Sequence, residues 1–122
     1  MSLKNPYDPH NIFAQIIRGD APCTRVYEDE WVLAFHDIAQ MAPIHVLVIP
    51  KNSYVDLQDF LNHANSAEIC GFWQGVKKTV EILDVQHSGY NLFTSIGADH
   101  GQDVFHFHVH ITAGKTLADI LS

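Results

Sequence analysis

The sequence contains few cysteines and no long hydrophobic run. Cys23 and Cys70 are the only cysteines among 122 residues, and their number and spacing predict neither a disulfide framework nor a cysteine zinc site. No stretch approaches the roughly 18 apolar residues of a membrane-spanning helix, and the N-terminus lacks the apolar region of a signal peptide. We therefore expect a protein of the cytoplasm that has no membrane partner.

Positive charge is also scarce. Seven Lys and Arg residues stand against fourteen Asp and Glu residues, which gives a formal net charge of −7. Nucleic-acid binding depends on clustered cations that release counterions from the phosphate backbone, so a nucleic-acid partner is disfavoured. A small phosphate ester remains compatible with this charge, because backbone N–H groups, a helix N-terminus or an imidazolium can bind it.

The sequence predicts two helices. The first lies between a plausible N-cap, Asn11, and Gly19, which occupies the position of a C-terminal glycine. The second covers 66–83, where apolar residues recur at spacings of three and four. Asn65 and Glu68 have the form of a capping box at its start.

Five strands are predicted around these helices. Two flank a turn at Glu28-Asp29-Glu30 within 24–38, and the others cover 42–50, 90–97 and 104–112. No repeat or linker interrupts the chain, so a single domain is expected. Long stretches of consecutive strand favour an α+β fold with an antiparallel sheet over a wound βαβ fold.

Three histidines alternate with apolar residues in the stretch FHFHVHIT, at 105–112. A helix would split both the apolar and the polar set, so we predict a strand with the three imidazoles on one face. One face of that strand would carry Phe105, Phe107, Val109 and Ile111, and the other His106, His108, His110 and Thr112.

Four interpretations of the three imidazoles compete. The first is a solvated or hydrogen-bonded strand face. The second is a metal site, although the outer pair lies about 13 Å apart along a strand and no Asp or Glu within the triplet completes a ligand set. The third, a purification tag, is excluded by the interleaved apolar residues and the internal position. The fourth is nucleophilic catalysis by the middle imidazole, with its neighbours positioning phosphate oxygens and moving protons.

The stretch from His106 to Thr112 resembles the signature of the histidine triad (HIT) family. Four further blocks resemble the family in order and spacing: IFAQIIRGDAP (12–22), VYEDEWVLAFHDI (26–38), APIHVLVIPK (42–51) and GADHGQDV (97–104). The resemblance covers about residues 10–114 and is greatest to the Hint branch of nucleoside phosphoramidases and nucleotide-binding proteins. It implies one HIT domain over 1–122, with 115–122 as a tail and a HIT-like antiparallel sheet of about five strands with two main helices.

The resemblance implies roles for four histidines. His108 matches the family nucleophile, whose Nε2 would attack an α-phosphorus and form a nucleotidyl-histidine that water hydrolyses. A hydrogen bond from its Nδ1 to a backbone carbonyl would keep Nε2 unprotonated. His106 and His110 match the flanking members, which contact phosphate oxygens or orient the nucleophile. His45 matches a fourth family histidine, which is either part of a proton relay or a satisfied core histidine.

The resemblance also implies a nucleotide pocket. Asp37 matches the carboxylate that accepts hydrogen bonds from the ribose hydroxyls. The slot for the base would contain Phe13, Phe35, His36 and Ile38. The loop that offers backbone N–H groups and a glutamine amide to the phosphate corresponds to Gly101, Gln102, Asp103 and Val104.

Several positions depart from the Hint pattern. Asp103 stands where Ser or Thr is usual, and we expect its carboxylate to point outward, because an inward charge would repel phosphate. Ser95 replaces a common asparagine at the nucleotide site, and Ser53 replaces a frequent histidine. The tail after Lys115 lacks the branch's tryptophan, and the zinc-binding cysteines of some relatives are absent. We expect no metal and no cofactor.

The favoured function is hydrolysis of purine nucleoside 5′-phosphoramidates of the AMP type through a nucleotidyl-histidine. One alternative is a nucleoside monophosphate-binding module with little turnover, and another is a dinucleoside polyphosphate hydrolase or nucleotidyltransferase. The resemblance also implies a homodimer. The helix over 66–83 would form its interface through Phe72, Trp73 and Val76, unless these residues belong to the core of one chain.

Overall fold

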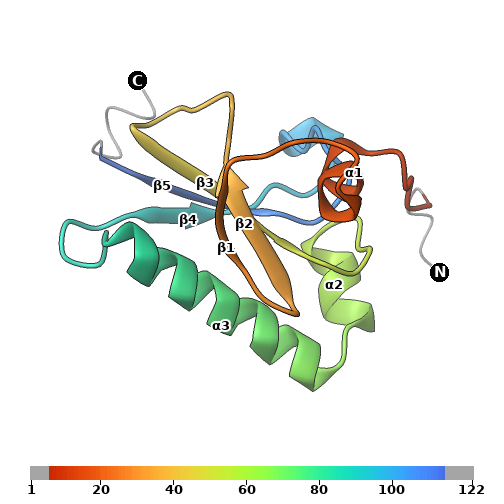
Figure 1. Ribbon diagram of the computed structural model, residues 1–122. Coiled ribbons are helices and arrows are strands. Elements are labelled where there is room, and N and C mark those ends of the chain that lie inside the picture. Colours follow the sequence, from red (N-terminus) through yellow and green to blue (C-terminus); the bar gives the residue numbers. More distant parts are fainter. Residues whose placement is uncertain (1–5, 115–122) are drawn as a thin grey trace.

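The computed structural model describes residues 6–114, which form an α+β fold with one antiparallel sheet (Figure 1). Its helices are α1 (Ile12–Arg18), α2 (Leu57–His63) and α3 (Ser66–Leu83), with a 3-10 turn η1 at Ala98–His100. Its strands are β1 (Arg25–Glu28), β2 (Val32–His36), β3 (Ile44–Pro50), β4 (Asn91–Phe93) and β5 (Val109–Ala113). The predicted fold class and both predicted helices are confirmed, whereas α2 was not predicted. The tail predicted over 115–122 lies outside the described residues.

The sheet has the strand order β1-β2-β3-β5-β4, and all neighbouring strands are antiparallel. The last strand, β5, therefore lies between β3 and β4. Its register places His45 opposite Thr112 and Leu47 opposite His110. This pairing brings a histidine from the middle of the chain next to the histidine-rich segment near its end.

The two faces of the sheet carry separate cores, because successive strand residues point in opposite directions. Helix α3 runs along one face, while α1 lies on the other (Figure 1). The α1 face packs Phe13 and Ile16 against Leu33, Phe35, Leu47 and Ile49. The α3 face contains Phe72, Val76 and Val80 of α3 together with Val32, Ala34, Val46, Val48, Phe60, Phe107, Val109 and Ile111.

Capping residues set the helix boundaries. The Asn11 side chain accepts a hydrogen bond from the N–H of Ala14 at 2.9 Å, and Gly19 ends α1 with a φ of 85°, a left-handed conformation that favours glycine. Asn65 caps α3 by accepting from the N–H of Glu68 at 2.9 Å. The predicted capping box is only half formed, since the Glu68 carboxylate instead accepts from the side chains of Asn52 and Tyr54.

The strand predicted over 104–112 is shorter than expected. Its ladder begins at Val109, because the preceding residues leave β3 and approach the loop after it. There the N–H of Phe107 donates to the carbonyl of Tyr54 at 2.7 Å. The predicted burial of the apolar face nevertheless holds for Phe107, Val109 and Ile111, and Phe105 is half-buried.

The interface predicted on the helix over 66–83 is only partly available. Phe72 and Val76 belong to the core of the chain, so they are not free to form an interface, whereas 38 % of Trp73 is exposed. The strand predicted over 90–97 is reduced to Asn91–Phe93. No helix within residues 6–114 has the length and hydrophobicity needed to cross a membrane.

Candidate active site

A cavity of about 690 Å³ lies on the α1 face of the sheet. Apolar side chains from α1, β2 and β3 form most of its wall, and imidazoles and carboxylates form one part of it. No Lys or Arg lines the cavity among the residues that the structure describes. The lining residues are Ile12, Phe13, Ile16, Ala21, Pro22, Cys23, Thr24, Phe35, His36, Asp37, Ile38, Ala39, Leu47, Asp103, Val104, His108 and His110.

The predicted site residues divide into two groups in space. Most of those assigned to the base, the ribose and the phosphate line the cavity. Ser95, Gly101 and Gln102 do not line it, and neither do His45 and His106, which lie behind its wall. Sequence reasoning missed eight lining residues. For Ile12 and Ile16 a signal existed, because the sequence places them on one helical face with Phe13.

His108 presents an unprotonated nitrogen at the cavity. Its Nδ1 lies 2.7 Å from the carbonyl oxygen of His106, and since a carbonyl only accepts, Nδ1 carries the proton. Its other nitrogen, Nε2, is then the one with a free lone pair. Burial lowers the pKa of His108, which keeps the ring neutral near pH 7. The edge-on ring of Phe13, 5.0 Å away between centroids, packs against it. The hydrogen bond to a backbone carbonyl that the sequence predicted for His108 is thus present.

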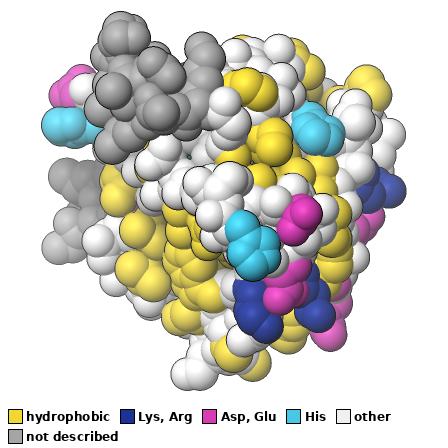
Figure 2. Space-filling model, turned by 90° about the vertical axis from the view of Figure 1, so that its left-hand side faces the viewer, with side chains coloured by type: hydrophobic (Ala, Val, Ile, Leu, Met, Phe, Trp, Pro, Cys, Tyr) yellow, Lys and Arg dark blue, Asp and Glu magenta, His cyan; other side chains and the backbone are white. Residues whose placement is uncertain are grey.

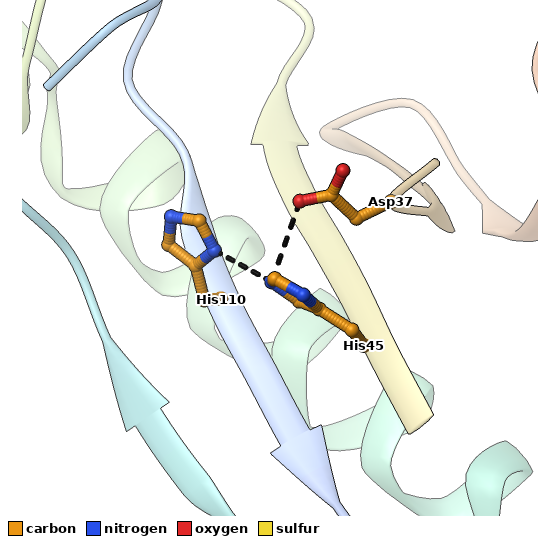
Figure 3. Close-up of side chains that lie close together, drawn as sticks. All are labelled: Asp37, His45 and His110. Carbon is orange, nitrogen blue, oxygen red and sulfur yellow. Dashed lines mark hydrogen bonds and ion pairs between the residues drawn. The ribbon is translucent and has the colours of Figure 1, made fainter. Parts of the chain in front are cut away.

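His45 is buried at the centre of a hydrogen-bonded group (Figure 3). The N–H of Met41 donates to its Nδ1 at 3.2 Å, so the proton of the neutral ring is on Nε2. Nε2 lies 2.8 Å from Nδ1 of His110 and 3.4 Å from a carboxylate oxygen of Asp37. Burial lowers the pKa of His45, and the Asp37 charge partly opposes this effect.

His110 receives this hydrogen bond at Nδ1, so its own proton is on Nε2. The ring is held flat against Phe93, with centroids 4.5 Å apart and planes at 5°. Its pKa is lowered to about 4, chiefly by burial and also by the neighbouring His108 and His45. His110 therefore lines the cavity as a neutral N–H donor, beside the free nitrogen of His108.

His106 is fully buried and does not reach the cavity. Its Nε2 donates to the carbonyl of Pro50 at 2.8 Å, and its Nδ1 accepts from the hydroxyl of Tyr7 at 2.6 Å. Of its two expected roles, only orientation of the nucleophile fits these contacts, because its backbone carbonyl holds His108. Tyr7 was not identified from the sequence, where nothing links it to a histidine 99 residues away.

The group formed by Asp37, His45 and His110 also has the proximity of a metal site, with ligand atoms within 4.8 Å of one another. A histidine that binds a metal through one nitrogen donates a proton from the other to an acceptor. The other nitrogen of His45 faces the N–H of Met41, which is a donor. The group therefore fits a hydrogen-bonded relay better than a metal centre.

The Gln102 side chain corrects one expectation. It is buried, its oxygen accepts from the N–H of Gly97 at 2.9 Å, and its nitrogen donates to the carbonyls of Val55 at 2.6 Å and Val104 at 3.1 Å. The amide predicted to contact phosphate is thus occupied by the backbone. It fixes the shape of the loop instead.

Asp103 lines the cavity with His108 and His110, and it is exposed to solvent. Its charge acts on both rings, because it opposes the fall in the pKa of each. Asp37, the other carboxylate of the cavity, accepts a hydrogen bond from the N–H of Ala39 at 2.9 Å.

Comparisons with known proteins agree with this architecture. Residues 18–117 match the model of the HIT domain. An uncharacterized 13.2 kDa HIT-like protein of Azospirillum brasilense is 44 % identical over 120 residues, which cover 98 % of each chain. A HIT family hydrolase from Clostridium thermocellum has a TM-score of 0.81 at 36 % identity, covering 88 % of this chain and 93 % of its own. A histidine triad nucleotide-binding protein from Candida albicans has a TM-score of 0.74 at 29 % identity, covering 83 % of this chain and 72 % of its own. This chain therefore belongs to the HIT family.

Proposed function

We propose that the protein hydrolyses purine nucleoside 5′-phosphoramidates of the AMP type through a nucleotidyl intermediate on His108. The observation that supports this function is the 2.7 Å hydrogen bond from Nδ1 of His108 to the carbonyl of His106. It leaves the lone pair on Nε2, the nitrogen that a phosphorus electrophile requires. The similarity to a HIT family hydrolase and to a HIT nucleotide-binding protein supports the same class of reaction.

The cavity suits the nucleoside part of such a substrate. Its volume of about 690 Å³ lies within the usual range for small-molecule sites, roughly 300–1,000 Å³. Phe13 and Phe35 offer apolar surface to a flat purine base. Asp37, which directly follows β2 and lines the cavity, would accept hydrogen bonds from the ribose hydroxyls.

The reaction would proceed in two displacements. A bound phosphoramidate anion raises the pKa of His110, which takes up a solvent proton at Nδ1, while the His45 proton moves from Nε2 to Nδ1 in place of the hydrogen bond from Met41. Nε2 of His108 then forms a bond to phosphorus, the P–N bond breaks, and His110 delivers its proton to the leaving nitrogen. In the second step His110 accepts a proton from water as the water oxygen bonds to phosphorus and the bond to His108 breaks. The products are an amine and a nucleoside monophosphate.

The charge of the cavity argues against a dinucleoside polyphosphate substrate. Asp37 and Asp103 line the cavity, and no Lys or Arg does so among the described residues. A polyphosphate carries several negative charges that such a wall repels. Asp103 also gives the binding-module alternative its support, since a carboxylate near the phosphate would slow turnover.

The test is amine release from an adenosine 5′-phosphoramidate. We expect steady release by the native protein and a loss of at least about a thousandfold for His108→Ala, because removing a nucleophile removes the covalent route. His87→Ala, in an exposed loop, is the matched control and should retain full activity. Equal rates for the native protein and His108→Ala would refute the catalytic role. Tight binding of AMP without amine release would instead support the binding module.

We also propose that two copies associate, each with one HIT domain over residues 1–122. Strand β4 forms an open edge of the sheet, where a second copy can extend the ladder. Tyr90 and Leu92, 44 % and 43 % exposed, lie beside and within this strand. Figure 2 shows that hydrophobic side chains are exposed on one side of the molecule. Sedimentation at micromolar concentration should give the mass of a dimer, and Leu92→Lys should shift it toward the monomer. A monomeric native protein would refute the association.

A further inference from the structure

The reactive part of the cavity contains a carboxylate that the proposed chemistry does not use. Asp103 precedes Val104 in the loop after η1 and lines the cavity with His108 and His110. It forms no ion pair with any residue of the described range 6–114. Its negative charge is therefore not neutralised by a neighbouring cation of that range.

The charges around the phosphorus position are unbalanced. The rings of His108 and His110 are neutral, since burial lowers the pKa of each. The remaining charged groups of the described lining are the carboxylates of Asp37 and Asp103. A substrate thus meets the N–H donor of His110 for one phosphoryl anion and a wall that repels any further negative charge.

The two carboxylates lie on different segments and suit different parts of a substrate. Asp37 directly follows β2 and shares a hydrogen-bonded group with His45 and His110, which fits the ribose side of the phosphorus. Asp103 belongs to the loop before β5. With the base on the apolar wall and the ribose at Asp37, the part of the substrate left to face Asp103 is the group that departs from phosphorus.

We propose that Asp103 forms a subsite for a cationic leaving group, so that the cavity prefers nucleotides whose phosphorus-bound substituent carries an ammonium. This inference rests on the proposed nucleotide site and names the substrate class within it. Amines that carry a second, positively charged nitrogen would be selected, and those with a carboxylate or phosphate would be rejected.

Binding of three adenosine 5′-phosphodiesters tests the subsite without requiring turnover. The choline ester carries a trimethylammonium, the 3,3-dimethylbutyl ester has the same shape without charge, and the 3-carboxypropyl ester carries an anion. By calorimetric titration at low salt, we expect the native protein to bind the choline ester about tenfold more tightly than the neutral ester and to bind the anionic ester most weakly. High salt, about 1 M, should reduce these ratios.

Two matched variants assign the effect to one carboxylate. In Asp103→Asn the choline and neutral esters should bind within about twofold of each other, because the amide has a similar shape and no charge. Asp99→Asn makes the same change of charge in exposed η1, outside the cavity, and should keep the native preference.

Three results would overturn the subsite. They are equal affinity of the native protein for the choline and neutral esters, a preference that persists in Asp103→Asn, and failure to bind any of the three esters. The proposed hydrolysis fails separately. A protein that shows the Asp103-dependent preference but releases no amine from phosphoramidates keeps the subsite and loses the hydrolysis. A protein that releases amine but shows no preference for the choline ester keeps the hydrolysis and loses the subsite.

Discussion

Acidification from about pH 7 to about pH 4 is expected to remove about 3 kcal/mol of folding free energy through His106 alone. The ring is fully buried, and burial lowers its pKa from 6.5 to about 4, although the hydrogen bond to the Pro50 carbonyl opposes this shift. In the unfolded chain the ring titrates near its ordinary value. Between these two pKa values the unfolded state binds a proton that the folded state does not, so stability falls as the pH falls. Each pH unit of that interval corresponds to about 1.4 kcal/mol.

Urea titrations at several pH values measure this effect. In His106→Gln the amide nitrogen can still donate to the Pro50 carbonyl, but the side chain no longer titrates. The free energy of unfolding of this variant should therefore depend less steeply on pH than that of the native protein, by up to about 1.4 kcal/mol per pH unit. His87→Gln, in an exposed loop, should retain the native dependence. Identical pH dependence of the native protein and His106→Gln would refute the reasoning.

Three further predictions concern hydrogen bonds and packing. Tyr7→Phe leaves the buried Nδ1 of His106 without its donor, so urea titration should show a loss of about 1–3 kcal/mol, and an unchanged midpoint would contradict the contact. Gly75→Ala would place a Cβ 2.5 Å from Cγ2 of Val32. Calorimetry should show that the free energy of unfolding falls by about 1–3 kcal/mol, even though alanine favours a helix by about 1 kcal/mol over glycine. A higher melting temperature would show that β2 moves to accommodate the methyl group. Gln102→Ala removes three hydrogen bonds from the loop. It should lower the free energy of unfolding by about 2–3 kcal/mol and raise KM for a phosphoramidate. Unchanged stability and KM would argue against a role of Gln102 in fixing the loop.

Elements with local determinants were predictable from the sequence. Asn11 and Gly19 define both ends of α1 through contacts within a few residues, and the structure confirms them. The alternation around Phe107 and Val109 placed the apolar side of the histidine segment in the core, because a two-residue period holds wherever the chain is extended. The short helix α2 was missed, since its seven residues have too few turns for a helical period to stand out.

Contacts between distant segments were not predictable in the same way. The partner of His106 is Tyr7, and the amide of Gln102 bonds to Val55, 47 residues earlier. Neither pair leaves a pattern in one sequence, because each depends on how the finished fold brings loops together. The presence of Asp103 in the cavity wall likewise depends on the loop after η1 and not on a local sequence pattern.

The central claim is that Nε2 of His108 is the nitrogen that bonds to phosphorus. The most direct measurement is a rapid mix of the protein with an adenosine 5′-phosphoramidate, an alkaline denaturing quench and mass spectrometry of the digested chain. We expect an adenylyl group on His108 before the amine reaches its steady rate of release, and none in His108→Ala. Steady amine release with no adenylyl group on the chain, or with the group on His106 or His110, would contradict the claim.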